Sequence, residues 1–186
     1  MHRCDLSENA QTYLTEFRRI LSAMETGMTT PELTNSISHN FIVQMIPHHE
    51  AAIEMSQNIL RYTSCVPLER IARGIITEQT ESIRQMQEAL CPCSQCENSE
   101  SALCRYQARF QQIIETMFRG MSCAPATNCL DADFMREMIP HHLGAIHMSE
   151  NALCFPICPQ LTPILEAIIT SQKRGVRQMQ TLLQCM

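Results

Sequence analysis

The sequence predicts an all-α helical bundle made of two tandem three-helix repeats that are related by a pseudo-two-fold axis. Three observations support this fold class. The sequence repeats itself at an offset of 93 residues, each half carries apolar residues at helical spacing, and the 186 residues include only five glycines. No segment alternates apolar and polar residues for long enough to indicate a strand.

The repeat is ungapped and extends through most of each half. Its centre is the segment Met-Ile-Pro-His-His, which occurs at Met45–His49 and again at Met138–His142. The same register reaches back to Tyr13 and Tyr106. Ten of the 13 methionines fall into five pairs at this offset. These pairs are Met24 with Met117, Met28 with Met121, Met45 with Met138, Met55 with Met148, and Met86 with Met179.

Each repeat is expected to contain three helices. In the first repeat an apolar stripe predicts a helix over 13–28. A second helix is expected from near Ser38, a short polar residue that can cap a first turn, to about Leu60. A third is expected from just after Pro67 to about Leu90. The matching segments of the second repeat are 106–121, Asp131–Leu153, and the residues after Pro163 to about Leu183.

Each second helix contains a proline away from its first turn. Pro47 and Pro140 have no main-chain N–H to donate to Val43 and Arg136, so a kink is expected beside each His pair. The domain organisation that follows is a first helical repeat over residues 1–90, a Cys-rich linker over 91–101, and a second helical repeat over 102–186. The two repeats are expected to fuse into one compact domain.

Composition and charge exclude several classes of function. The net charge is −5 and the basic residues form no cluster, so nucleic acid is not an expected partner. No apolar run approaches the roughly 20 residues that span a bilayer. The N-terminal segment Met1–Ser7 is polar and has no secretory leader. The protein is therefore expected either to stay inside the cell or to have its leader outside this chain.

The eleven cysteines leave the redox compartment open. Because the number is odd, at least one thiol has no intramolecular disulfide partner, or some thiols are metal ligands. Cys91, Cys93 and Cys96, with Cys104 nearby, fit a set of disulfides and a thiolate cluster equally well. Only Cys65 and Cys158, which are not part of this group, match each other across the repeat.

The repeated Met and His residues are the candidate metal ligands. On a helix Met45, His48 and His49 fall within a sector of about 100°, and Met55 lies near its edge. One face therefore offers two thioethers and two imidazoles. The second repeat duplicates it with Met138, His141, His142 and Met148, and the first helices add Met24, Met28, Met117 and Met121. In the third helices Gln79, Met86, Gln172 and Met179 are interpreted as residues that support the ligands.

Ligand softness favours copper over other metals. Thioethers with imidazoles suit Cu(I), whereas imidazole alone also suits Cu(II) or zinc. Iron in helical bundles uses carboxylates that include Glu-x-x-His pairs, and no such pair occurs here. The alternative interpretation is that a methionine stripe at helical spacing is core packing, which is common because Met fills irregular space. Zinc and iron are accordingly the less favoured metals.

The pattern Phe-x3-Met-Ile-Pro-His-His-x2-Ala-Ile-x-Met, followed by Ile-Ile-x2-Gln and a later Met, resembles the bacterial family known as domain of unknown function 305. The resemblance covers nearly the whole chain and implies a ferritin-like bundle, commonly doubled. It also implies a location in the cell envelope or outside the cell, and copper binding, which is associated with some members. Where family members tend to have acidic residues, the first repeat has Ser38-His39-Asn40, and the second has Asp131 and Asp133. His39 is then a candidate substitute.

Three functional hypotheses follow from these observations. The favoured one is a copper-binding protein that sequesters Cu(I) or exchanges it with a donor or acceptor protein. The second is a metal-dependent redox enzyme that acts on oxygen or peroxide. The third is a metal-free structural bundle stapled by disulfides. The oligomeric state, and the choice between one shared site and two separate sites, stay open at this stage.

Overall fold

The protein, analysed as a computed structural model, is described from residue 5 to residue 186; residues 1–4 of the segment Met1–Ser7 lie outside the described part. Six α-helices follow one another in this part of the chain, which confirms the predicted all-α bundle. They are α1 (Glu8–Thr29), α2 (Ile37–Ile59), α3 (Val66–Cys93), α4 (Glu100–Ser122), α5 (Leu130–Leu153) and α6 (Leu161–Leu183).

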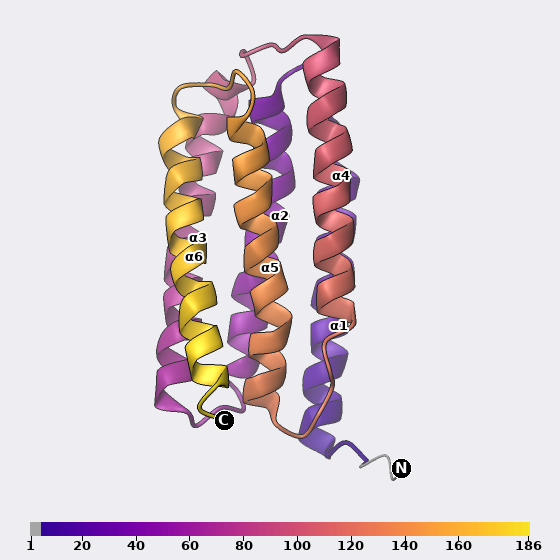
Figure 1. Ribbon diagram of the computed structural model, residues 1–186, viewed down its shortest axis with the longest axis vertical. Helices are drawn as coiled ribbons and strands as arrows, with labels where there is room; N and C mark the ends of the chain where they lie inside the picture. Colours follow the sequence, from indigo (N-terminus) through magenta and orange to yellow (C-terminus); the bar gives the residue numbers. More distant parts are fainter. Residues whose placement is uncertain (1–4) are drawn as a thin grey trace.

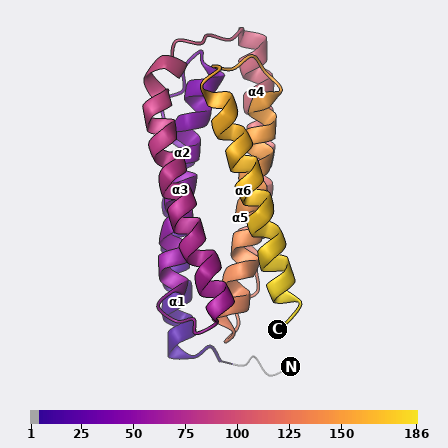
Figure 2. The same cartoon turned by 90° about the vertical axis from the view of Figure 1, so that its left-hand side faces the viewer.

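The helices form three layers of two. Helices α2 and α5 lie in the centre, α3 and α6 cover one side, and α1 and α4 cover the other (Figure 1). The view turned by 90° shows that the first repeat and the second stand face to face (Figure 2). The repeats pack on each other through α2 against α5 and through α3 against α6. None of the described helices combines the length and the hydropathy that a bilayer crossing requires.

Helix starts differ in detail from the expected ones. Ser36 caps α2, since its hydroxyl accepts a hydrogen bond from the N–H of His39 at 3.2 Å. The expected cap, Ser38, lies inside the first turn and uses its hydroxyl for a tertiary contact instead. Asp131 likewise lies in the first turn of α5. At its other end α3 continues past Leu90, into the segment that was expected to be linker.

The two internal prolines lie where the first helix of each repeat crosses the second. Pro47 and Pro140 are both accommodated inside continuous helices. Each faces a glycine: a Cβ on Gly27 would lie 2.7 Å from Cβ of Pro47, and one on Gly120 would lie 2.9 Å from Cβ of Pro140. Both distances are shorter than any real carbon–carbon contact, so only glycine allows the helices to approach this closely.

Matched hydrogen bonds show the duplication in three dimensions. The side-chain N–H of Asn58 donates to the carbonyl oxygen of Tyr13 at 3.1 Å, and that of Asn151 donates to the carbonyl oxygen of Tyr106 at 3.1 Å. All four residues are buried. These bonds tie the C-terminal part of each second helix to the first helix of the same repeat.

One buried polar contact breaks the symmetry. The Tyr13 hydroxyl donates to Oε2 of Glu137 at 2.6 Å, which links the two repeats. At the matching positions Gln44 donates instead to the carbonyl oxygen of Met28 at 3.3 Å, and the Tyr106 hydroxyl has no partner among the described residues. Burial raises the pKa of Glu137 to about 8, and the hydrogen bond from Tyr13 offsets only part of that effect.

The close contacts at the prolines predict the effect of adding one methyl group. Gly27→Ala should lower the free energy of unfolding by about 1–3 kcal/mol, because α1 must move away from Pro47. The measurement is urea denaturation. Gly74→Ala is the matched control, since nothing lies within 4 Å of its Cβ, and it should be neutral or stabilise by up to about 1 kcal/mol. Equal stability of the two variants would contradict the close-packing account.

The raised pKa of Glu137 predicts a pH dependence of stability in the metal-free protein. Between pH 4.5 and about 8 its carboxyl is protonated in the folded state and ionised in the unfolded chain, so stability falls as pH rises through this window. Glu137→Gln introduces glutamine, the residue that the first repeat has at the matching position 44, and removes this pH-dependent loss of stability. The variant should match the wild type near pH 4 and exceed it by about 2–4 kcal/mol at pH 9.

The measurement is the free energy of unfolding from denaturant titrations at several pH values. Glu166→Gln serves as the control because that carboxyl is exposed. Its stability should run parallel to that of the wild type throughout. A Glu137→Gln curve that also runs parallel would show that the buried carboxyl does not titrate as described.

Candidate metal centre

The ten methionines that pair across the repeat all lie in one buried hydrophobic cluster. None of them is more than 2% exposed. They come from all six helices, so the thioethers are collected in the interior between the two repeats. The ten are Met24, Met28, Met45, Met55, Met86, Met117, Met121, Met138, Met148 and Met179.

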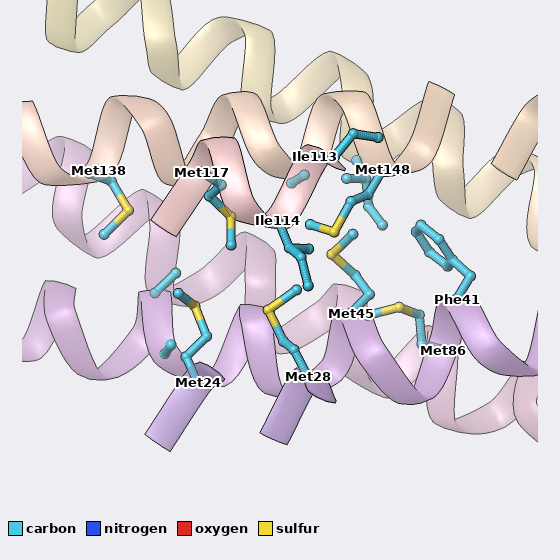
Figure 3. Close-up of a cluster of buried hydrophobic side chains, with 14 of the residues drawn as sticks. Met24, Met28, Phe41, Met45, Met86, Ile113, Ile114, Met117, Met138 and Met148 are labelled. Carbon is cyan, nitrogen blue, oxygen red and sulfur yellow. The ribbon is translucent and has the colours of Figure 1, made fainter. Parts of the chain in front are cut away.

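Three of these side chains gather around a fourth, Met45. Figure 3 shows the sulfur of Met45 beside that of Met148, with Met28 and Met86 pointing toward them. These four residues come from α2, α5, α1 and α3, and we refer to them as the first thioether cluster. The repeat places Met55, Met121, Met138 and Met179, all buried, at the four corresponding positions, and we refer to these residues as the second thioether cluster. Each cluster therefore takes three residues from one repeat and one from the other.

The remaining matched pair lies between these clusters. Met24 of α1 and Met117 of α4 point toward each other, and Met138 lies beyond them on the far side from Met45 (Figure 3). Because Met24 and Met117 are partners in the repeat, their meeting point lies on or near the pseudo-two-fold axis. In this view the labelled thioethers follow one another along the core (Figure 3).

Two histidines meet across the interface of α2 and α5. The rings of His48 and His141 stack with centroids 3.7 Å apart and planes inclined by 29°. Nε2 of His48 lies 3.2 Å from the carbonyl oxygen of His141, and Nε2 of His141 lies 3.1 Å from the carbonyl oxygen of His48. A carbonyl oxygen only accepts, so both Nε2 atoms must carry the proton. Each Nδ1 is then a bare lone pair, and neither has a partner among the described residues.

The second histidine of each motif points toward the third helix of its own repeat. Nε2 of His49 lies 3.1 Å from Oγ of Ser82 on α3. His142 faces Gly175 on α6, where an added Cβ would lie 2.8 Å from its Cδ2 and 2.9 Å from its Nε2. Ser82 and Gly175 are matching positions of the repeat. The two imidazoles therefore differ in their contacts although their own positions correspond.

Burial keeps all four imidazoles neutral. It lowers the pKa of His49 to about 3 and that of His141 to about 4, and it holds the pKa values of His48 and His142 well below the usual value. Repulsion between neighbouring imidazoles adds to this effect at His48, His49 and His142. Neutral imidazoles are the form that binds metal ions.

Hollows between α3 and α6 reach the histidines from outside. A hollow of about 590 Å³ is lined by His142, and an adjoining one of about 320 Å³ is lined by His49. Gln79 and Gln172 line both hollows and are buried at their floor. Among the described residues, neither amide atom of Gln79 has a hydrogen-bond partner, nor does Oε1 of Gln172.

Other donors are dispersed. Within residues 5–186, no three His, Cys, Asp or Glu side chains converge in a way that could hold one metal ion. His39, the candidate substitute for an acidic residue, bonds Oγ of Ser94 through Nδ1 at 2.8 Å. Thioethers are therefore the donors that the fold brings together in number.

Sequence reasoning missed two groups of polar residues. The contact between Tyr13 and Glu137 could have been suspected, because Glu137 replaces Gln44 inside an otherwise repeated segment. The contact of His49 with Ser82 had no such signal, since an exposed-looking serine on a helix is unremarkable in a sequence. Both groups depend on which helices meet, which local spacing does not reveal.

Comparison with solved structures finds the same helical fold in CopM and in a DUF305 fragment. The structure of CopM in its Ag-bound form matches over 81% of this chain and 97% of its own length, at 24% identity and a TM-score of 0.61. A DUF305 fragment from Deinococcus radiodurans matches over 84% of this chain and its whole length, at 25% identity and a TM-score of 0.60. CopM in its Cu(II)-bound form matches over 79% of this chain and 95% of its own, at 25% identity and a TM-score of 0.59.

Comparison at the level of sequence agrees with these structures. No curated protein sequence matches this chain. The sequence signature described as domain of unknown function (DUF305) matches twice, over residues 15–90 and 39–183, as expected for a duplicated unit. Together the two matches span most of the chain and include both Met-Ile-Pro-His-His segments. The chain belongs to the DUF305 family.

Proposed function

We propose that this protein binds Cu(I) as cargo in its two thioether clusters, and that it sequesters the ion or passes it to another protein. The observation that carries the proposal is the convergence of Met28, Met45, Met86 and Met148 in the core (Figure 3). The structurally similar CopM is described in Ag-bound and Cu(II)-bound forms. Its identity to this chain is only about a quarter, so the residues of this chain carry the argument.

The chemistry of the core selects a soft monovalent ion. Thioether sulfurs are weak donors to hard cations and good donors to Cu(I). A cation in an apolar interior is stable only if donors replace its water, and a single charge costs less to desolvate than a double one. Thioether side chains from four helices, gathered in one region of the core, offer such donors (Figure 3). Zinc and iron would instead need grouped imidazoles, thiolates or carboxylates.

The imidazoles add nitrogen donors at two depths. His48 and His141 lie in the centre of the bundle, where their bare Nδ1 atoms have no other partner among the described residues. His49 and His142 lie at the floor of the hollows between α3 and α6. We infer that an ion arriving from solvent meets His49 or His142 before it reaches the thioethers. The ion would then pass from an imidazole nitrogen, a donor of intermediate softness, near the hollow to the softer thioether sulfurs in the core.

Paired substitutions in each cluster should remove one Cu(I) each. The parent should bind two equivalents in anaerobic competition with a chromogenic Cu(I) chelator. Both the double variant Met28→Leu, Met45→Leu and the double variant Met121→Leu, Met138→Leu should bind one equivalent, because leucine keeps the volume but has no sulfur. The titrations are run in two parallel series. In one series all eleven cysteines are replaced by serine, and in the other they are kept, so that Cu(I) bound by thiols is counted separately from Cu(I) bound by thioethers.

Met135→Leu is the matched control. This methionine is fully buried but has Ile42 as its partner in the repeat, so it lies outside the paired set. The control should retain both equivalents, and circular dichroism should show that every variant is folded. If the cluster variants also retained both equivalents in each series, the thioether sites would be refuted. If no version bound Cu(I), the metal-free structural hypothesis would stand.

The position of His142 predicts an effect on rate. His142→Ala should slow the uptake of Cu(I) from the chelator by about tenfold while leaving the number of bound equivalents at two. The measurement is stopped-flow absorbance under anaerobic conditions. Thr181→Ala is the control, because Thr181 lines the same hollow at the surface. An unchanged rate for His142→Ala would show that ions reach the core by another path.

A further inference from the structure

Three thiols from both repeats meet at one end of the bundle. Cys93 ends α3, Cys96 follows three residues later, and Cys158 precedes α6. Cys93 and Cys158 belong to the same buried cluster, Cys96 packs against it, and both neighbouring thiols affect the pKa of Cys158. Cys93 is fully buried and Cys158 is 4% exposed, whereas Cys96 is partly exposed. These thiols are not used by the copper sites proposed above.

Separate hydrogen bonds fix the main chain on both sides of this thiol group. Oγ of Ser36 donates to the carbonyl oxygen of Cys93 at 2.9 Å, and Oγ of Ser38 accepts from the N–H of Cys158 at 2.9 Å. Both serines belong to the start of α2, so one turn of helix holds both cysteines. Asn98 adds a further tie, since its side chain donates to the carbonyl oxygen of Pro156 at 2.7 Å.

The surroundings of Cys158 favour its ionised form. Burial alone would raise its pKa, but hydrogen bonds from Cys93, from the N–H groups of Gln160 and Leu161, and from Cys96 lower it overall. The two N–H groups belong to the start of α6, and that of Leu161 also donates to the carbonyl oxygen of Cys158 at 2.9 Å. For Cys93, burial and then the neighbouring thiols raise the pKa above its usual value.

We propose that Cys158 reacts with hydroperoxides and forms a reversible disulfide with Cys93 that joins the two repeats covalently. The Cys158 thiolate attacks one peroxide oxygen, which gives a sulfenic acid and releases hydroxide from hydrogen peroxide. The sulfur of Cys93 then attacks the sulfenic sulfur, the S–S bond forms and water leaves. Two thiols are oxidised and one peroxide is reduced to two waters. An external dithiol restores the reduced form by exchange.

The exposure of Cys158 restricts the oxidant to a small molecule such as hydrogen peroxide. The matching residue, Cys65, lies directly before the third helix of its own repeat, α3, whereas two residues separate Cys158 from α6. The position that matches Cys93 is Met186, at the end of the chain, so Cys65 lacks the corresponding thiol. Cys65 is therefore an internal control for the effect of the surroundings.

The test uses a full-length variant in which the disulfide can be assigned without ambiguity. Cys91→Ser, Cys104→Ser and Cys154→Ser leave one tryptic peptide with Cys93 and Cys96 and another with Cys158 alone. The reduced protein is treated with one equivalent of hydrogen peroxide, alkylated and digested for mass spectrometry. The expected product is a cross-link between these two peptides that dithiothreitol reverses. The cross-linked protein should melt about 5–10 °C higher.

Four further variants decide the assignment. The cross-link should be absent in Cys93→Ser and in Cys158→Ser, and it should persist in Cys96→Ser and in Cys65→Ser. Any cysteine variant that fails to show the wild-type circular dichroism is replaced by the corresponding Cys→Ala. A bond between Cys93 and Cys96 would overturn the proposal. Oxidation of Cys158 no faster than Cys65 would overturn it as well.

Discussion

The stacked pair of His48 and His141 sets how the two repeats fit together. Each imidazole donates to the main chain of the other repeat, so a shift of one repeat by a single residue would break both bonds. It would also leave two buried donors unsatisfied, and each such donor costs about 1–3 kcal/mol. This register decides which sulfurs meet. It brings Met45 of α2 beside Met148 of α5 rather than beside a residue of its own helix (Figure 3).

Packing and metal binding draw on the same side chains in this core. Methionine fills irregular space between helices, and its sulfur remains available as a soft donor. The structural interpretation of the methionine stripes and the copper interpretation are therefore compatible. What separates them physically is clustering: core packing needs volume at each position, whereas binding needs several sulfurs at one point. The sulfurs of Met45 and Met148 lie beside each other, with Met28 and Met86 on either side of them (Figure 3).

The sequence predicted what depends on spacing and missed what depends on contact. Helical periodicity and the repeat were enough for six helices and five buried methionine pairs, because periodicity directly reflects which face is buried. They could not tell Ser36 from Ser38 as the cap of α2. Both are short hydroxyl residues, and only the tertiary contact of Ser38 with Cys158 separates their roles. The grouping of sulfurs from four helices was hidden for the same reason.

Because each thioether cluster borrows one methionine from the other repeat, neither repeat could build a cluster alone. A chain with one repeat would have to form a homodimer about a true two-fold axis, and dilution would then release its cargo. Fusion fixes the effective concentration of the second half and makes assembly independent of protein concentration. It also frees the halves to differ, as Gln44 and Glu137 do. The surroundings of the two clusters can therefore differ, whereas in a symmetric homodimer the free protein presents two identical clusters.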